Sequence, residues 1–317
     1  MPIQIAVLDD YQGVARDLGP WETLAPEAEV TYFHDHVALP GVVRDLLAGF
    51  EVVVAMRERT PFGAELLASM PDLELLVTTG MANASIDLEA AREHRITVCG
   101  TRALAHPTAE LTWGLILALQ RHLVEEDRRM RDGGWQRTIG PGLAGRTLGT
   151  LGLGRLGRRV TEIALAFEME VIAWSENLTD EAAEEAGATR VERDELFARA
   201  DVLSIHTRLS DRTRGLVGAR ELALMKPTAV LVNTSRGPIV DEDALLAALH
   251  EGTIAGAALD VYAKEPLPRD HLLRQAPRTL LSPHLGYVTT EHYELFYADA
   301  VEDIAGWMRG ELVRVLN

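Results

Sequence analysis

The 317-residue sequence has a single cysteine, Cys99, and this scarcity excludes a disulfide within the chain and any metal site built on paired cysteines. It has no uncharged apolar run near about 18 residues and no charged n-region before an apolar segment at its start. It is also poor in positive charge, because 48 acidic residues oppose 31 basic ones and give a net charge of −17. We therefore expect a cytoplasmic protein with no membrane contact, no bound metal and no nucleic-acid partner, since a phosphate backbone demands clustered cations.

Hydrophobic residues make up 47% of the chain, enough at this length to bury large cores, and the length favours two domains over one. Short apolar runs alternate with helical patterns, which is typical of parallel sheets with crossover helices. One long helix is expected from about Ala105 to Arg131, and a last helix from about Thr290 to Arg309. Strands are expected in two series, at 3–8, 30–33, 52–55, 73–77 and 96–98, and then near 150, 171, 202–205, 229–233, 257–260 and 280–281.

A glycine-rich turn joins a strand to a helix at the start of the second series. The run GLGRLG places Gly152, Gly154 and Gly157 directly after the apolar residues 147–151. Gly152 permits a tight turn, Gly154 lets the backbone approach phosphates, and Gly157 lets the helix pack closely on the strand. Because the free N–H groups of the helix would face an anion, the turn predicts a site for a dinucleotide pyrophosphate.

Four residues with chemically useful side chains follow the later strands. Arg236 comes after 230–233, Asp260 and Glu265 follow 257–259, and His284 follows 280–281. Taken alone, each such residue is more often an ordinary surface or loop residue. At the shared carboxyl edge of a parallel sheet, however, a guanidinium can grip a carboxylate in two parallel hydrogen bonds. A histidine beside a carboxylate favours its protonated form and can donate that proton to a carbonyl oxygen.

Four motifs, GLGRLG, NTSRG, ALDVYAKEPL and SPHLG, occur in this order, and the whole chain resembles the D-isomer-specific 2-hydroxyacid dehydrogenases. The resemblance implies two doubly wound parallel-sheet α/β domains: a flavodoxin-like substrate domain of residues 1–100 and 286–317, and an inserted Rossmann dinucleotide-binding domain of residues 101–285. It implies that Arg236 binds the substrate carboxylate and that Glu265 is the acidic partner of His284, the acid/base. The residues that it implies for cofactor binding are Gly152, Gly154, Arg155, Leu156, Gly157, Thr207, Thr234, Asp260 and His284.

In the first domain, the segment Thr79-Gly80-Met81-Ala82-Asn83 stands where this family has a loop whose backbone amides receive the substrate carboxylate. The segment departs from the glycine-rich sequence that is usual in the family, because Ala82 stands where glycine is common. We expect Gly80, Met81 and Ala82 to contact the substrate. Arg57 is a further candidate, although an exposed pair of Arg57 and Arg59 compensated by Glu58 is an equal alternative.

The choice of cofactor depends on the position about 20 residues beyond the glycines, where NAD enzymes carry an acidic residue for the ribose hydroxyls. Ser175 stands there, followed by Glu176. A serine removes the repulsion of a 2′-phosphate, whereas Glu176 would repel it and no arginine follows in the turn. We therefore expect NAD, with NADP as an alternative, and contacts from Ser175 and Glu176.

These features together predict an NAD(P)-dependent oxidoreductase that transfers a hydride between nicotinamide and a small 2-keto or 2-hydroxy acid. The alternative is a non-catalytic dinucleotide sensor similar to the corepressor branch of the same family. The resemblance also implies a homodimer, with a contact made by the long helix and the segment 133–135.

Overall fold

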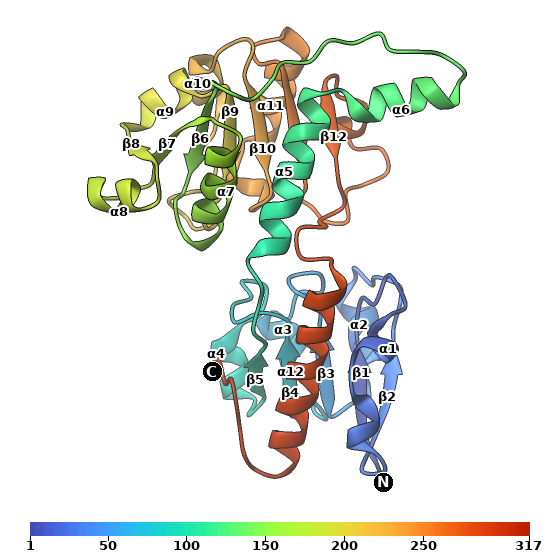
Figure 1. Ribbon diagram of the computed structural model, residues 1–317. Coiled ribbons are helices and arrows are strands. Elements are labelled where there is room, and N and C mark those ends of the chain that lie inside the picture. Colours follow the sequence, from blue (N-terminus) through green and yellow to red (C-terminus); the bar gives the residue numbers. More distant parts are fainter. The chain divides into compact units, whose positions relative to one another are not determined.

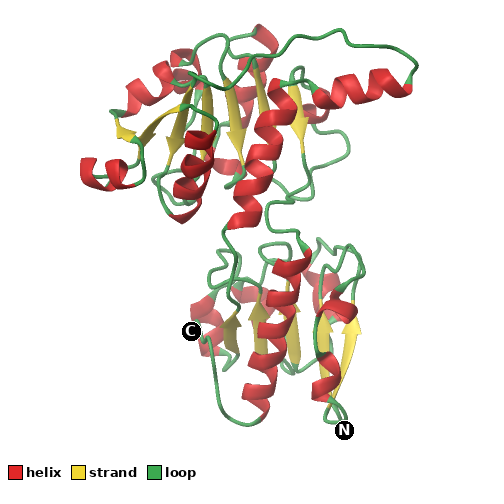
Figure 2. Cartoon of the chain, viewed as in Figure 1, coloured by secondary structure: helices red, strands yellow, loops and turns green.

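The computed structural model describes residues 1–317 and divides them into two compact units. Unit 1 consists of residues 1–104 and 288–317, and unit 2 of residues 105–287. Each unit is a parallel sheet with helices packed along it (Figures 1 and 2). Two doubly wound α/β units, as expected from the sequence, are thus confirmed.

Unit 1 contains a five-stranded sheet with the strand order β2-β1-β3-β4-β5, in which every pair is parallel. This order reverses between β1 and β3, and such a switch point is where ligands bind in flavodoxin-like sheets. The last helix packs against α1 and β4, so both ends of the chain build this unit. The strands are β1 (Ile3–Val7), β2 (Ala28–Tyr32), β3 (Val52–Ala55), β4 (Leu75–Thr78) and β5 (Thr97–Gly100). The helices are α1 (Ala15–Leu18), η1 (Trp21–Leu24), α2 (Pro40–Leu46), α3 (Ala64–Ala68), α4 (Leu88–Glu93) and α12 (Thr290–Met308).

Unit 2 contains a seven-stranded parallel sheet with the order β12-β11-β10-β9-β6-β7-β8, which reverses between β6 and β9. This is the dinucleotide-binding order with one strand added at the edge. The strands are β6 (Thr147–Leu151), β7 (Glu170–Trp174), β8 (Thr189–Arg190), β9 (Val202–Ile205), β10 (Val230–Asn233), β11 (Gly256–Leu259) and β12 (Thr279–Leu281). The helices are α5 (His106–Gln120), α6 (Leu123–Arg131), α7 (Arg155–Ala166), α8 (Asp180–Glu185), α9 (Arg193–Arg199), α10 (Ala219–Leu224), η2 (Gly237–Ile239), α11 (Glu242–Glu251) and η3 (Leu272–Gln275).

The single long helix expected over residues 105–131 is wrong. It is two helices, because His122 between α5 and α6 has a φ of +52°, a left-handed conformation that a right-handed helix cannot continue. Helix α6 extends away from the sheet, and the chain beyond it returns to β6 (Figure 1). The edge strand β8 was also not expected, since two residues are too short to show an alternating pattern.

Burial explains why the central strands read as continuous apolar runs. All residues of β3, β4, β9, β10 and β11 are buried, because helices cover both faces of each sheet. Polar side chains therefore stand out where these strands end. The site residues expected from the sequence follow strands at the carboxyl edges of the two sheets.

Candidate active site

The glycine-rich turn of unit 2 has the close contacts that demand glycine. Gly152 has a φ of +102°, and a Cβ there would lie 2.7 Å from the Thr207 amide nitrogen. A Cβ on Gly157 would lie 2.2 Å from the Gly152 carbonyl oxygen, because the first turn of α7 packs directly on the strand end. Both glycines thus set the shape of the turn. Thr207, expected to contact the cofactor, lies against this turn.

Gly154 plays a different part, since no atom lies within 4 Å of a Cβ built on it. It precedes α7, followed by the exposed Arg155 and the half-buried Leu156. The free N–H groups at the start of α7 therefore open onto accessible space, where a phosphate would find both the helix dipole and a cation. This cradle fits the pyrophosphate of a dinucleotide.

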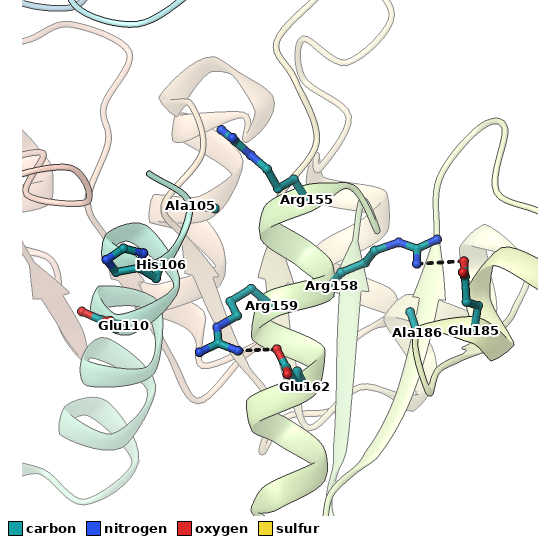
Figure 3. A pocket seen from close by; sticks show the side chains of 9 residues that line it. All are labelled: Ala105, His106, Glu110, Arg155, Arg158, Arg159, Glu162, Glu185 and Ala186. Carbon is teal, nitrogen blue, oxygen red and sulfur yellow. Dashed lines mark hydrogen bonds and ion pairs between the residues drawn. The ribbon is translucent and has the colours of Figure 1, made fainter. Parts of the chain in front are cut away.

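A pocket of about 790 Å³ opens beside α7 and α5, lined by charged side chains of both signs. Figure 3 shows Arg155 projecting away from Arg158 and Arg159. Arg158 donates to Glu185 over 3.0 Å, and Arg159 pairs with Glu162 one helical turn away. Of the three arginines, Arg155 is the one at the first position of α7, beside the glycine-rich turn.

Ser175 and Glu176 follow β7 directly, at the place expected for recognition of the ribose. Glu176 is exposed and Ser175 is half-buried. The Ser175 carbonyl accepts a hydrogen bond from the Leu178 amide over 3.0 Å, which closes a turn here. The acidic side chain of Glu176 thus stands on an exposed turn at the end of β7.

His206, which follows β9 beside the turn, has a positioning part that its sequence context did not show. Its Nε2 lies 2.8 Å from the Ser204 hydroxyl, and burial lowers the pKa of the imidazole to about 4. The ring is therefore neutral at physiological pH. The Cβ of His206 lies 3.6 Å from a Cβ built on Gly157, so this residue packs against the glycine-rich turn.

The loop of Arg236 is fixed by the residue that ends β10. The Asn233 side chain accepts from the Ser235 amide at 3.0 Å and donates to the Arg236 carbonyl at 3.0 Å. A Cβ on the following Gly237 would lie 2.0 Å from the Tyr262 carbonyl carbon. The chain therefore carries Arg236 directly past the loop that leads to Glu265.

His284 and Glu265, separated by 19 positions in sequence, form a pair: the Nδ1 of His284 lies 2.6 Å from the Oε2 of Glu265. The second carboxylate oxygen of Glu265 accepts from the Tyr262 amide at 2.9 Å. The imidazole retains 19% of its exposure, so it is oriented by one nitrogen without being enclosed. His284 has a φ of +56°, a left-handed conformation that residues other than glycine seldom adopt.

Asp260 is fully buried and holds the loop that carries His284. One carboxylate oxygen accepts from the Ser282 hydroxyl at 2.5 Å and from the Leu285 amide at 2.7 Å, and the other accepts from the Gly286 amide at 2.9 Å. Burial raises the pKa of Asp260 above its ordinary value, while these donors act in the opposite direction. Both oxygens are thus occupied by the residues that flank His284, which gives Asp260 a positioning part.

Helix α5 supports the same region through two threonines that the sequence did not single out. The Thr112 and Thr234 hydroxyls lie 2.8 Å apart, and the Thr108 hydroxyl donates to the Gly286 carbonyl at 2.7 Å. Thr234 is thereby turned toward the helix. Unit 2 thus brings together the loops of Thr234, Arg236, Asp260, Glu265 and His284.

The expected substrate residues of unit 1 follow β3 and β4. Gly80 has a φ of +95°, and a Cβ there would lie 1.8 Å from the Arg57 guanidinium, which therefore covers this glycine. Arg57 also donates to the Thr79 carbonyl at 2.9 Å and lies 3.6 Å from Glu58. It is tied to the loop rather than exposed, while Met81 and Ala82 are exposed on the same loop.

No helix of the chain is both long enough and apolar enough to cross a membrane.

Comparison with known proteins agrees with this geometry. The family model described as D-isomer specific 2-hydroxyacid dehydrogenase, NAD binding domain, matches residues 113–286. The glyoxylate reductase of Aeropyrum pernix is 42% identical over 258 residues, which cover 78% of this chain and 77% of that protein. The crystal structure of a phosphoglycerate oxidoreductase from Vibrio cholerae is 38% identical, with a TM-score of 0.93, and the match covers 97% of this chain and 99% of that one. A putative D-3-phosphoglycerate dehydrogenase from Ralstonia solanacearum is 35% identical, with a TM-score of 0.94 and coverage of 99% and 97%. This chain therefore belongs to the D-isomer-specific 2-hydroxyacid dehydrogenase family.

Proposed function

We propose that the protein transfers a hydride between a nicotinamide dinucleotide and a small 2-keto or 2-hydroxy acid, with His284 as the acid/base. The observation that carries this proposal is the 2.6 Å contact between His284 and Glu265 in the unit that also carries the glycine-rich turn. A histidine with only a structural role does not need to remain partly exposed while its Nδ1 contacts a carboxylate. Such a pair suits a proton transfer to an oxygen.

The dinucleotide supplies the hydride when it is bound, and the protein supplies position and a proton. The backbone amides that follow Gly154, together with Arg155, Leu156 and Gly157, would hold the pyrophosphate. His284 gives its proton to the substrate oxygen in reduction and takes it back in oxidation, while Glu265 keeps the ring oriented. The two loops that carry Thr207 and Thr234, together with the buried Asp260, keep the nicotinamide end of the site in shape.

The substrate acid is held by charge and by backbone amides. The planar guanidinium of Arg236 grips its carboxylate in two parallel hydrogen bonds. In unit 1, the resemblance implies substrate contacts from the amides of Gly80, Met81 and Ala82, and Arg57 is hydrogen-bonded to the same loop. Unit 1 is thus the substrate domain and unit 2 the dinucleotide-binding domain.

NAD is the preferred cofactor in this proposal, with NADP as the weaker one. Glu176 repels a 2′-phosphate, and Arg158, a cation of the adjacent helix, is engaged by Glu185. Ser175 offers a hydroxyl to the ribose. The kinetic preference between NADH and NADPH measures this balance directly.

A homodimer completes the proposal. No residue of α6 is buried, and in the segment that follows it Trp135 is 71% exposed and Ile139 is 96% exposed. This part of unit 2 therefore presents apolar side chains that the unit itself does not cover. A second copy of the chain is the occupant that the resemblance implies. Light scattering at micromolar concentration tests it, and a monomer would contradict it.

A panel of 2-keto acids assayed with NADH and with NADPH tests the proposed activity. It includes glyoxylate and hydroxypyruvate, pyruvate, and bulkier acids. Oxidation of the dinucleotide with at least one acid is the expected result. Binding of NADH without turnover of any acid would refute the catalytic proposal and favour a dinucleotide sensor.

A further inference from the structure

The histidine proposed as the acid/base has an aromatic neighbour that the proposed function does not use. Tyr287 lies three residues beyond His284, and the centres of the two rings are 5.4 Å apart with an angle of 72° between their planes. Aromatic rings favour this edge-to-face arrangement at distances of about 4.5 to 7 Å. Tyr287 is the last residue of unit 2 and is only 7% exposed, so the contact lies within one unit and the residues around the tyrosine ring hold it in place.

The hydrogen bond of the His284 imidazole does not by itself fix the direction of the ring. Its Nδ1 lies 2.6 Å from the carboxylate of Glu265, which is 32% exposed, and the imidazole keeps 19% of its own exposure. The Cβ–Cγ torsion of histidine has a broad energy minimum, so a partly exposed ring is easily turned about this bond. Such a turn moves Nε2, the nitrogen that would exchange a proton with the substrate. A second contact is therefore needed to hold Nε2 in one direction.

The turn of the chain between the two rings is fixed by other residues of unit 2. The Asp260 carboxylate accepts from the Leu285 amide at 2.7 Å and from the Gly286 amide at 2.9 Å, and the Thr108 hydroxyl donates to the Gly286 carbonyl at 2.7 Å. A Cβ on Gly286 would lie 3.2 Å from the Asp260 carboxylate and 3.2 Å from the Thr108 side chain. The backbone that joins the two rings is thus held from both sides. The tyrosine ring therefore stands in a fixed position beside the imidazole.

We propose that Tyr287 is a positioning residue for the proposed reaction, in which its ring restricts the His284 imidazole and keeps Nε2 in one direction. This inference rests on the proposed function for the part that His284 plays. Glu265 holds the imidazole by a hydrogen bond at Nδ1, and Tyr287 holds it by a ring contact. A misplacement of about 1 Å can cost about 10²-fold in rate, so a contact that limits the movement of the acid/base group contributes to kcat.

Loss of the tyrosine ring should lower kcat and leave substrate binding almost unchanged. Tyr287→Ala is expected to reduce kcat for the best keto acid by about tenfold, the equivalent of one aromatic pair, with KM changed by less than about twofold. The loss stays moderate because Glu265 still holds Nδ1. Tyr287→Phe, which keeps the ring, should retain nearly the wild-type kcat.

Phe167→Ala is the matched control, because it also removes one ring of an aromatic pair in unit 2. Phe167 follows the end of α7, and its ring centre lies 4.9 Å from that of Trp113. The end of α7 is remote from the glycine-rich turn at its start, so this variant should keep the wild-type kcat. A fall in Phe167→Ala equal to that in Tyr287→Ala would assign both losses to the stability of the unit and overturn the proposal.

A background without the imidazole separates positioning of His284 from a general effect of Tyr287. In His284→Ala there is no ring to hold, so the further change Tyr287→Ala should leave the residual kcat as it is. A tenfold further fall in this background would overturn the proposal. A fall in Tyr287→Phe equal to that in Tyr287→Ala would do the same, because it would assign the effect to the hydroxyl group. If Tyr287→Ala did not fold, Tyr287→Leu, which keeps a large apolar side chain without a ring, is expected to show the same losses.

An NMR readout that needs no substrate separates failure of this inference from failure of the proposed function. In the wild type without cofactor, the proton between Nδ1 of His284 and Glu265 should give a low-field resonance that exchanges slowly with water and is absent in His284→Ala. The resonance should broaden or vanish in Tyr287→Ala and persist in Tyr287→Phe and Phe167→Ala. If no keto acid were turned over but this pattern appeared, the proposed activity would fail and the positioning contact would stand. Turnover of keto acids with an equally sharp resonance in Tyr287→Ala and wild type would refute the positioning part of Tyr287 alone.

Discussion

The two units each carry a histidine whose Nδ1 contacts a carboxylate after a sheet strand, but the two pairs differ in what surrounds the carboxylate. Glu265 is about one-third exposed and has one further partner, the Tyr262 amide. Asp9, the partner of His36, is 2% exposed and is bound by a hydroxyl, with an arginine on its carbonyl. An accessible pair can exchange protons with a bound substrate, whereas a buried carboxylate is held in one position by its partners. The comparison predicts a larger effect of substitution on activity at the accessible pair and a larger effect on stability at the buried one.

The largest effect is expected at the accessible pair. His284→Ala should lower kcat for the best keto acid by about 10² to 10⁴-fold, because it removes the general acid. Cofactor binding, followed by tryptophan fluorescence, should survive. His250→Ala, at an exposed position of α11 in the same unit, is the control. Turnover near the wild-type value in His284→Ala would remove His284 from the chemistry.

A smaller loss is expected from Arg236→Lys, since an ammonium cannot reproduce the two parallel hydrogen bonds of a guanidinium. The fall in kcat/KM should be about 10- to 100-fold, the cost of one hydrogen bond to a charged group, and should appear mainly in KM. Steady-state kinetics with the exposed Arg212→Lys as control measures it. Equal kcat/KM in Arg236→Lys and wild type would show that Arg236 does not bind the acid.

For stability we expect the opposite order, with a larger loss at the buried pair of His36 and Asp9 than at the accessible pair of His284 and Glu265. Asp9→Asn should lower the free energy of unfolding by about 1–3 kcal/mol, because it weakens bonds at a buried charge. Asparagine tolerates the left-handed conformation of this position, so the backbone is not the cause. Glu265→Gln, at a more exposed pair, should cost less than about 1 kcal/mol. Denaturant unfolding of both variants compares them, and a larger loss in Glu265→Gln would reverse the interpretation of the two pairs.

The smallest effect concerns a second buried carboxylate of unit 1. Burial raises the pKa of Asp303 to about 7, and Asp299 and Glu302 act in the same direction, although Arg314 lies 3.0 Å away. A raised pKa in the folded state means that this group stabilises the fold at low pH and that its contribution is lost as pH rises from about 4 to 7. Because asparagine does not ionise, the Asp303→Asn variant does not lose stability in this way as pH rises.

The Tm difference between Asp303→Asn and the wild type should therefore move in favour of the variant by a few degrees, on the order of 1 kcal/mol, between pH 4 and pH 8. Thermal unfolding followed by circular dichroism at these two pH values measures it. Asp243→Asn, near the start of α11 in unit 2, is a matched substitution away from this cluster. A difference that is independent of pH would show that Asp303 is ionised throughout the range.

Much of the architecture was predictable from the sequence because its causes are local. The apolar runs of β3, β9 and β10 mark strands buried on both faces, and Gly152 and Gly157 mark a turn where a Cβ has no room. The motif residues Arg236, Glu265 and His284 follow strands of one sheet, so a shared edge could be expected. The order of these elements along the chain carries this information.

Only the tertiary structure decided which side chains meet. The 2.6 Å contact of His284 with Glu265, the enclosure of Asp260 by three donors and the contact of His36 with Asp9 all join residues distant in sequence. The break at His122 was likewise hidden, because helical periodicity continues across it in the residue pattern. Sequence sets which residues lie at a strand end, since that depends on neighbours in the chain. Strand order and loop conformation set distances and burial, and those depend on the whole fold.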